Sequence, residues 1–208
     1  MKARVLSMFC GGIIGEALSV IRTYENDYGI ISRNYGIGGT RIARQIHPSQ
    51  YPHWDLNYID RADDIDPNAD VIVVFGGTND FGHGDAPFGR FDSTDEYTFC
   101  GALRALLVKL MVKHPYATIV LMTPLHRLSE NVTTNEIGLP CHPLRDYVEM
   151  EKRMAEYYSV PVLDLWSVSG IQPAVPENFI AYTADGLHPN DRGAERVADR
   201  LIGFLSAL

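Results

Sequence analysis

Asp185 and His188 stand three positions apart in the segment Asp185-Gly186-Leu187-His188-Pro189, near the end of the sequence. A carboxylate and an imidazole at this spacing are suited to proton transfer. The histidine can take a proton from a nucleophile, while the aspartate orients the ring and stabilises the imidazolium that forms. Asp-Gly is also common in turns, so the pair alone fits either a surface turn or a catalytic dyad. The segments that precede it must decide between the two.

The elements that would position this pair follow an alternating pattern. Short β-branched and apolar runs alternate with helical segments, which is typical of βαβ units around a parallel sheet. The sequence predicts strands at 4–9, 28–34, 71–75, 118–122 and 160–163, and helices at 13–23, 97–114, 143–158 and 191–207. The last three strands are almost continuously apolar, as expected when helices cover both faces of a sheet. We therefore expect an α/β fold with a central parallel sheet of five strands.

Composition limits the class of protein. A chain of 208 residues with 46% hydrophobic content can bury one full core, and no linker divides it, so we expect a single domain spanning 1–208. The net charge of −8 argues against nucleic acid or an anionic membrane as the main partner and favours a small-molecule substrate. No apolar run approaches the ~20 residues of a membrane span and no cleavage site follows the start, which predicts a cytoplasmic protein.

The cysteines suggest neither a disulfide framework nor a zinc site. Cys10, Cys100 and Cys141 are odd in number, widely spaced and without a Cys-x-x-Cys pair. We expect no metal and no other cofactor, and nothing in the sequence indicates the oligomeric state. The segments 45–67 and 125–143 are expected to be long and irregular, and either could line a pocket.

Two glycine-rich turns follow expected strands. Asn34-Tyr35-Gly36-Ile37-Gly38-Gly39-Thr40 comes after the second strand, and Gly76-Gly77-Thr78-Asn79-Asp80 comes after the third. Ligands of doubly wound sheets bind beyond the carboxyl ends of the strands, where these turns lie. Glycine lets a backbone N–H approach a ligand closely, and Asn79 could add a side-chain donor. The turns are therefore suited to an oxyanion hole, although glycines also end strands without any such role.

In order and spacing, the two turns and the Asp-x-x-His segment resemble three blocks of the SGNH hydrolases, also called GDSL-type esterases or lipases. The resemblance covers essentially the whole chain. It implies a three-layer, flavodoxin-like sandwich, the SGNH hydrolase fold. By the same resemblance, Gly39 and Asn79 would form the oxyanion hole, and Asp185 and His188 would complete a catalytic triad.

The first block departs from the family, which has Gly-Asp-Ser directly after the first strand and uses the serine as nucleophile. Alignment on Phe9 places Cys10, Gly11 and Gly12 there, so Gly12 occupies the position of the missing nucleophile. A thiolate at Cys10, near a helix N-terminus and an imidazole, would be a competent nucleophile. An apolar-flanked cysteine at a strand end is more often a small core residue, and we favour that interpretation.

The resemblance implies an ester hydrolase, in a chain disabled by substitution or a natural pseudoenzyme. The absence of a long apolar lid segment favours a short acyl group, such as acetate, on a small alcohol or carbohydrate. Residues suited to the substrate are Tyr51, Trp54, His126, Arg127 and Tyr182. The alternatives are a non-catalytic module that binds an acylated ligand and a hydrolase that depends on Cys10. A nucleotide or flavin binder is a weaker alternative, because the first turn lacks the P-loop Lys and Ser/Thr.

Overall fold

The structure, a computed structural model, describes residues 4–10 and 30–208 of the chain. Its sheet has five strands in the order β2-β1-β3-β4-β5, and every neighbouring pair is parallel. The strands are β1 (Arg4–Cys10), β2 (Ile30–Asn34), β3 (Val71–Phe75), β4 (Thr118–Met122) and β5 (Val162–Leu163). This is the flavodoxin-like order, which reverses direction between β1 and β3. The predicted fold class is therefore confirmed.

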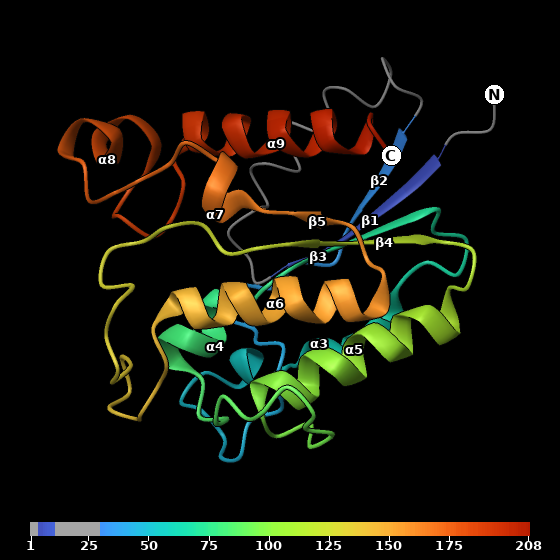
Figure 1. The fold of residues 1–208 in the computed structure, drawn as a ribbon, viewed down its shortest axis with the longest axis horizontal. Helices are drawn as coiled ribbons and strands as arrows, with labels where there is room; N and C mark the ends of the chain where they lie inside the picture. Colours follow the sequence, from blue (N-terminus) through green and yellow to red (C-terminus); the bar gives the residue numbers. More distant parts are fainter. Residues whose placement is uncertain (1–3, 11–29) are drawn as a thin grey trace.

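Helices cover both faces of the sheet (Figure 1). On one side lie α7 (Leu165–Val168), α8 (Pro176–Tyr182) and α9 (Asp191–Leu205). On the other lie α3 (Tyr58–Arg61), α4 (Thr78–His83), α5 (Phe99–Lys113) and α6 (Leu144–Tyr158). The predicted helix at 13–23 falls outside the described residues.

Successive residues of the central strands point into two separate cores. Ile72 and Val74 of β3 pack in the core beneath α5 and α6, whereas Val73 and Phe75 pack in the core under α9. The residues of β4 alternate in the same way. Strand geometry explains this, because consecutive side chains project to opposite faces. The nearly continuous apolar runs in the sequence are thus the mark of a sheet buried on both sides.

Element boundaries agree with the predictions except where capping intervenes. Strands β3 and β4 have the predicted limits, whereas β1 continues to Cys10 and β5 begins at Val162. Val160 does not join β5, because its N–H donates to the carbonyl of Ala155 at the end of α6, where Ser159 adopts the left-handed conformation. The side chain of Thr98 caps α5 by accepting from the N–H of Gly101, so the helix begins after it.

The segment 45–67 was expected to be irregular, and this prediction was wrong in part. It contains the short helices η1 (Pro52–Asp55), α3 and η2 (Ala62–Asp64). Asn57 caps α3 by accepting from the N–H of Asp60. The acidic residues here are not simply solvated: Asp60 pairs with Arg44, and Asp63 with Lys109 and Lys113. The segment 125–143 is irregular as predicted.

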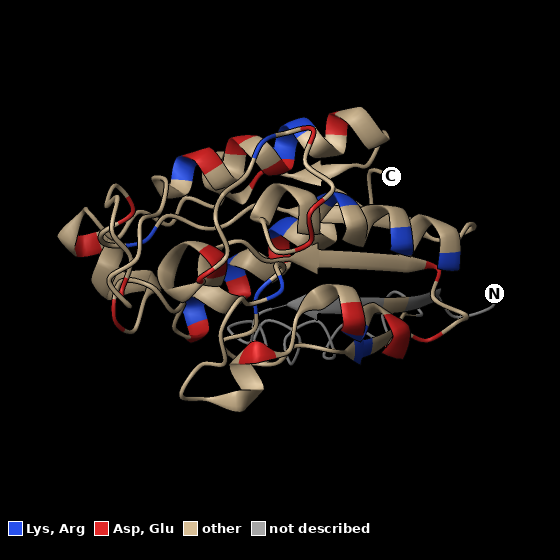
Figure 2. Cartoon of the chain, turned by 90° about the horizontal axis from the view of Figure 1, so that it is seen from below, with Lys and Arg blue, Asp and Glu red and all other residues tan. Residues whose placement is uncertain are grey.

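Charges of both signs are distributed over the described surface. In the view of Figure 2, Lys and Arg are interspersed with Asp and Glu along the helices and loops. Within the described ranges, none of the helices combines the length and apolar character that crossing a membrane requires.

Glu151 of α6 is a buried acid in the layer beneath the sheet, 1% exposed. Neither carboxyl oxygen has a hydrogen-bond partner among the described residues. Burial, together with the nearby charge of Asp80, raises the pKa of Glu151 well above its ordinary value, so folding favours the neutral form of this group. The unfolded chain releases the proton above about pH 4.3, and stability must therefore fall as pH rises beyond that point.

Glu151→Gln should consequently stabilise the protein at pH 8 but not at pH 4. The amide keeps the shape of the side chain and does not ionise, so the gain in free energy of unfolding at pH 8 should exceed about 1 kcal/mol. Urea unfolding of parent and variant across this pH range measures it. Glu156→Gln, an exposed position on the same helix, is the matched control. Parallel pH curves for Glu151→Gln and its parent would show that Glu151 is ionised in the fold.

Candidate active site

The predicted dyad is formed. Nδ1 of His188 lies 2.7 Å from Oδ2 of Asp185, and Oδ1 of the same carboxylate accepts the backbone N–H groups of Leu187 and His188 at 2.9 and 2.7 Å. Gly186 makes this tight turn possible with a φ of 84°. The segment is therefore a turn whose hydrogen bonds hold the carboxylate against the ring, and its catalytic role stays a prediction.

The dyad fixes which nitrogen of His188 is basic. Burial opposes ionisation of Asp185, but the hydrogen bonds from His188 and Leu187 outweigh it and lower the pKa of Asp185 to about 2. An ionised carboxylate can only accept, so Nδ1 of His188 carries its hydrogen and Nε2 has the lone pair. The side chains of Asp185 and His188 are 53% and 49% exposed. Nε2 of His188 is thus arranged as a proton acceptor on an accessible surface.

Gly39 occupies a position that only glycine fits. Its φ is 76°, and a Cβ there would stand 2.1 Å from two atoms of the Trp54 indole. Trp54 therefore packs directly on the backbone of the turn. Tyr51 extends the aromatic surface, with its ring centroid 4.4 Å from that of Trp54. Tyr51 is 43% exposed, so this surface is open to a ligand.

Asn79 and Asp80 connect the two glycine turns. Nδ2 of Asn79 donates to the carbonyl of Thr40 at 2.9 Å. The buried carboxylate of Asp80 accepts the N–H groups of Ile42 at 3.0 Å and Ala43 at 2.9 Å. Burial raises the pKa of Asp80 to about 6 against the opposing effect of these hydrogen bonds. The turn after β2 and the turn after β3 are thus held as one unit.

His126 and Arg127 belong to the segment after β4. Nδ1 of His126 lies 3.0 Å from Glu130, and its ring stacks on Trp166 with centroids 3.7 Å apart. Arg127 pairs with Glu136 at 2.7 Å, and its side chain is only 10% exposed. The next residue, Leu128, donates its N–H to the carbonyl of Gly186 at 2.8 Å. This segment therefore packs against the turn of the dyad.

The remaining predicted residues are placed as follows. Tyr182 lies with its hydroxyl 2.6 Å from Nη2 of Arg196 and its ring under that guanidinium, so it contacts α9. Gly12 lies outside the described residues. Cys10 is the last residue of β1, where its backbone pairs with Phe75, directly before Gly76.

Sequence reasoning overlooked His83, which lies beside the aromatic surface. Its ring centroid is 4.4 Å from that of Trp54, and Arg41 donates to its Nδ1 and to its carbonyl, at 2.8 and 2.7 Å. The spacing of four between Asn79 and His83 would have indicated a shared face, had α4 been predicted as a helix.

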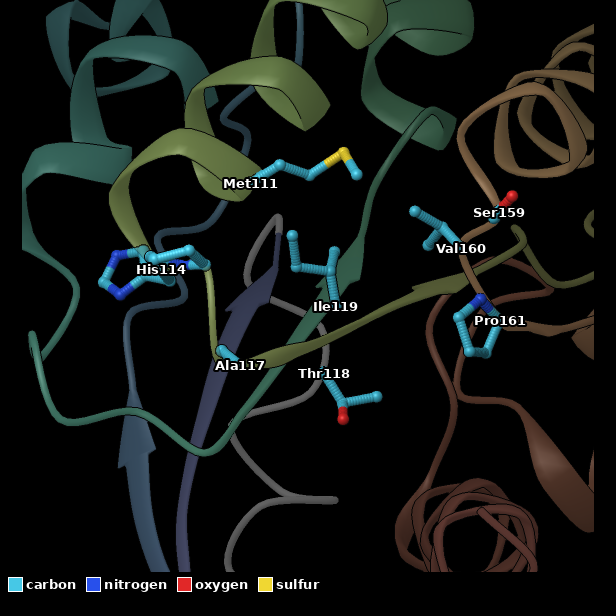
Figure 3. A pocket seen from close by; sticks show the side chains of 9 residues that line it. Met111, His114, Ala117, Thr118, Ile119, Ser159, Val160 and Pro161 are labelled. Carbon is cyan, nitrogen blue, oxygen red and sulfur yellow. The ribbon is translucent and has the colours of Figure 1, made fainter.

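A cavity of about 280 Å³ lies elsewhere (Figure 3). It is lined by the first residues of β4, the residues just before β5 and the ends of α5 and α6, among them Met111, His114, Ile119 and Val160. These are the amino ends of the strands, opposite the edge at which the glycine turns begin. No residue of the candidate active site lines this cavity.

Asp80→Asn should weaken the connection between the glycine turns. The amide offers one acceptor oxygen in place of two and turns a donor toward a backbone N–H, so the free energy of unfolding should fall by about 1–3 kcal/mol. Urea unfolding measures the loss, and amide hydrogen exchange at Ile42 and Ala43 should quicken. Asp92→Asn, an exposed change in a pair with Arg90, is the control. Unchanged exchange at Ile42 and Ala43 would show that other contacts hold this segment.

Comparison with known proteins agrees with this geometry. The model of the GDSL-like Lipase/Acylhydrolase family matches residues 19–196. No curated protein matches the chain. A solved structure from Lactobacillus plantarum shares 28% identity over 100% of this chain and 98% of its own, with a TM-score of 0.82. Another crystal structure shares 31% identity over 98% and 96% of the two chains, with a TM-score of 0.80.

A more distant structure, described as a possible lipase from Chitinophaga pinensis, shares 20% identity over 98% of both chains with a TM-score of 0.65. At that identity it supports the fold alone. The family match spans most of the sequence, in agreement with the turns and the Asp-His pair described above. The chain therefore belongs to the GDSL-like lipase/acylhydrolase family, and this membership indicates a general ester-hydrolase activity.

Proposed function

We propose that the chain carries the site of a serine esterase for short acyl esters, such as acetates, of a small alcohol or carbohydrate, with its nucleophile absent at Gly12. The observation that carries this proposal is the Asp185–His188 pair, joined at 2.7 Å with Nε2 of the histidine left as a base. Family membership supports the reaction class. A disabled variant and a natural pseudoenzyme both fit this description.

The reaction would proceed in the usual order for a serine hydrolase. A hydroxyl at position 12 attacks the acyl carbonyl while Nε2 of His188 takes its proton. Asp185 stabilises the imidazolium, and the N–H of Gly39 and the amide of Asn79 stabilise the oxyanion. His188 then gives the proton to the leaving alcohol, and water hydrolyses the acyl-enzyme by the same route. No step requires a cofactor.

The aromatic surface of Tyr51 and Trp54 is our candidate for the wall that holds the substrate, because it packs on Gly39 and is open to solvent. His126 lies in the segment 125–143, which contacts the turn of Asp185 and His188, and it remains a candidate for contact with the substrate. Arg127 and Tyr182 are engaged with Glu136 and Arg196, so we assign them a supporting role in the site walls.

Two alternatives follow from the empty position. Without a hydroxyl at residue 12, the same site would bind an acylated ligand without cleaving it. A Cys10-dependent hydrolase is the other, since the backbone of Cys10 ends β1 at the edge where Gly76 begins the next turn. The two differ in whether the chain as it stands turns over an ester.

Gly12→Ser should create or greatly increase hydrolysis of a chromogenic acetate ester. We expect a gain of about two orders of magnitude or more at neutral pH, because the paired Asp185 and His188 would activate the serine and Gly39 and Asn79 would hold the oxyanion. The parent and the variant are compared side by side, with rates corrected for buffer hydrolysis.

His188→Ala in the Gly12→Ser background is the control, and it should abolish the gain. Activity of the parent that serine does not raise would instead make Cys10 the residue to test, through Cys10→Ala. If neither protein hydrolyses the ester, the site does not act as a serine esterase and the binding module is favoured.

A further inference from the structure

His83 is held in a single tautomer by Arg41. A guanidinium only donates hydrogen bonds, so the contact of 2.8 Å from Nη2 of Arg41 requires a lone pair on Nδ1 of His83. The hydrogen of the neutral ring must then lie on Nε2. The same Nη2 also donates to the carbonyl of His83 at 2.7 Å, and Nη1 donates to the carbonyl of Trp54 at 3.2 Å. Arg41 thus holds the ring of His83 through Nδ1 and the backbone of Trp54 through its carbonyl.

His83 is also neutral at physiological pH. Burial and the adjacent charge of Arg41 lower the pKa of His83 to about 4. Arg127 acts in the same direction, and Glu136 opposes it. The ring therefore keeps the Nε2–H form throughout the neutral range. This is the reverse of His188, in which Nδ1 carries the hydrogen.

The position of His83 relates it to the oxyanion hole. Asn79 and His83 lie four residues apart on α4 (Thr78–His83), so their side chains share one face, about 6 Å apart along the helix axis. Trp54 contacts both Gly39 and His83: its indole packs on Gly39, and its ring centroid lies 4.4 Å from that of His83. His83 thus lies one helical turn beyond the group that would hold the reacting carbonyl.

Two side-chain donors at this place lack a hydrogen-bond acceptor within the part of the chain that the structure describes. Among the described residues, neither Nε2 of His83 nor Nε1 of Trp54 has a hydrogen-bond partner, and neither atom is fully buried. Water can therefore reach both donors in the free protein, and a ligand that displaces this water without offering an acceptor would leave them unpaired at a cost in free energy. A ligand that brings acceptor oxygens would satisfy both, while the aromatic faces of Trp54 and Tyr51 suit the C–H face of a sugar ring.

We infer that His83 determines the specificity of the site. With Trp54, it donates hydrogen bonds to hydroxyl or ring oxygens of a carbohydrate ester, one helical turn beyond the ester carbonyl. This inference rests on the proposed function and narrows its substrate class. Plain alkyl esters offer no oxygen at that place, so discrimination comes from leaving the two donors unpaired.

The test uses the chain as it stands, because without a serine it can bind an ester without consuming it. A monoacetylated methyl glucopyranoside is titrated into isotope-labelled protein, with ethyl acetate as the comparison. We expect the sugar ester to shift the Nε2–H signal of His83 and the Nε1–H signal of Trp54, and ethyl acetate to shift neither. The ¹⁵N shifts of His83 should show the Nε2–H tautomer from about pH 5.5 to 8.

His83→Phe keeps the ring and removes the donor. It should weaken binding of the sugar ester about tenfold, the cost of one hydrogen bond. His142→Phe, a change at an exposed histidine stacked on Phe88, should bind as the parent does. In the Gly12→Ser background, the preference for the sugar ester over the alkyl ester should fall by the same factor in His83→Phe.

The outcomes separate this inference from the proposed function. Signal shifts with the sugar ester but no hydrolysis by Gly12→Ser would uphold His83 as a donor in a binding module. Hydrolysis by Gly12→Ser with no shift at His83 or Trp54, or with an unchanged preference in His83→Phe, would overturn the role of His83 and leave the esterase standing. A protonated His83 above pH 6 would overturn it as well.

Discussion

The candidate site depends on one buried carboxylate. Asp80 accepts the N–H groups of Ile42 and Ala43, and so holds the segment after β2 against the beginning of α4. Asp85 repeats the arrangement with Ile46 and His47 at 2.8 and 2.7 Å. Two glycine turns that come from different strands are therefore held in one relative position. Burial raises the pKa of Asp80 to about 6, so keeping this carboxylate ionised at neutral pH costs stability.

Two histidines near these turns carry their hydrogen on different ring nitrogens, because one faces a carboxylate and the other a guanidinium. Asp185, which can only accept, holds a hydrogen on Nδ1 of His188 and leaves Nε2 basic. Arg41, which can only donate, removes the hydrogen from Nδ1 of His83 and leaves Nε2 as a donor. One ring can take a proton, and the other can only offer a hydrogen bond. In the proposed esterase, His188 would move a proton during attack on the carbonyl carbon, and His83 would donate a hydrogen bond to an oxygen of the alcohol part.

Local patterns were enough to predict the central strands, since Val71–Phe75 and Thr118–Met122 are apolar on both faces. They also indicated the dyad, because Asp185 and His188 are neighbours in sequence. They failed where long-range contacts decide. The helix α4 contains Gly82 and is flanked by Gly77 and Gly84, and its hydrogen bonds are supported by Asp80 and the segments packed on it. Likewise, no periodicity places Trp54 on Gly39, because that contact is made by the fold of a segment predicted as irregular.

The segment 125–143 joins the two halves of the site. At one end Leu128 donates to the carbonyl of Gly186 in the dyad turn. Further along, the N–H of Glu136 donates to Gly82 at 2.9 Å, and the amide of Asn135 donates to the carbonyl of Gly84 at 2.8 Å, both at the end of α4. These bonds, like those of Asp80, lie wholly within the described residues and require nothing of residue 12. The contacts that hold the turns of Gly39, Asn79 and Asp185 are therefore independent of residue 12, so introducing serine there tests the proposed site without any other change.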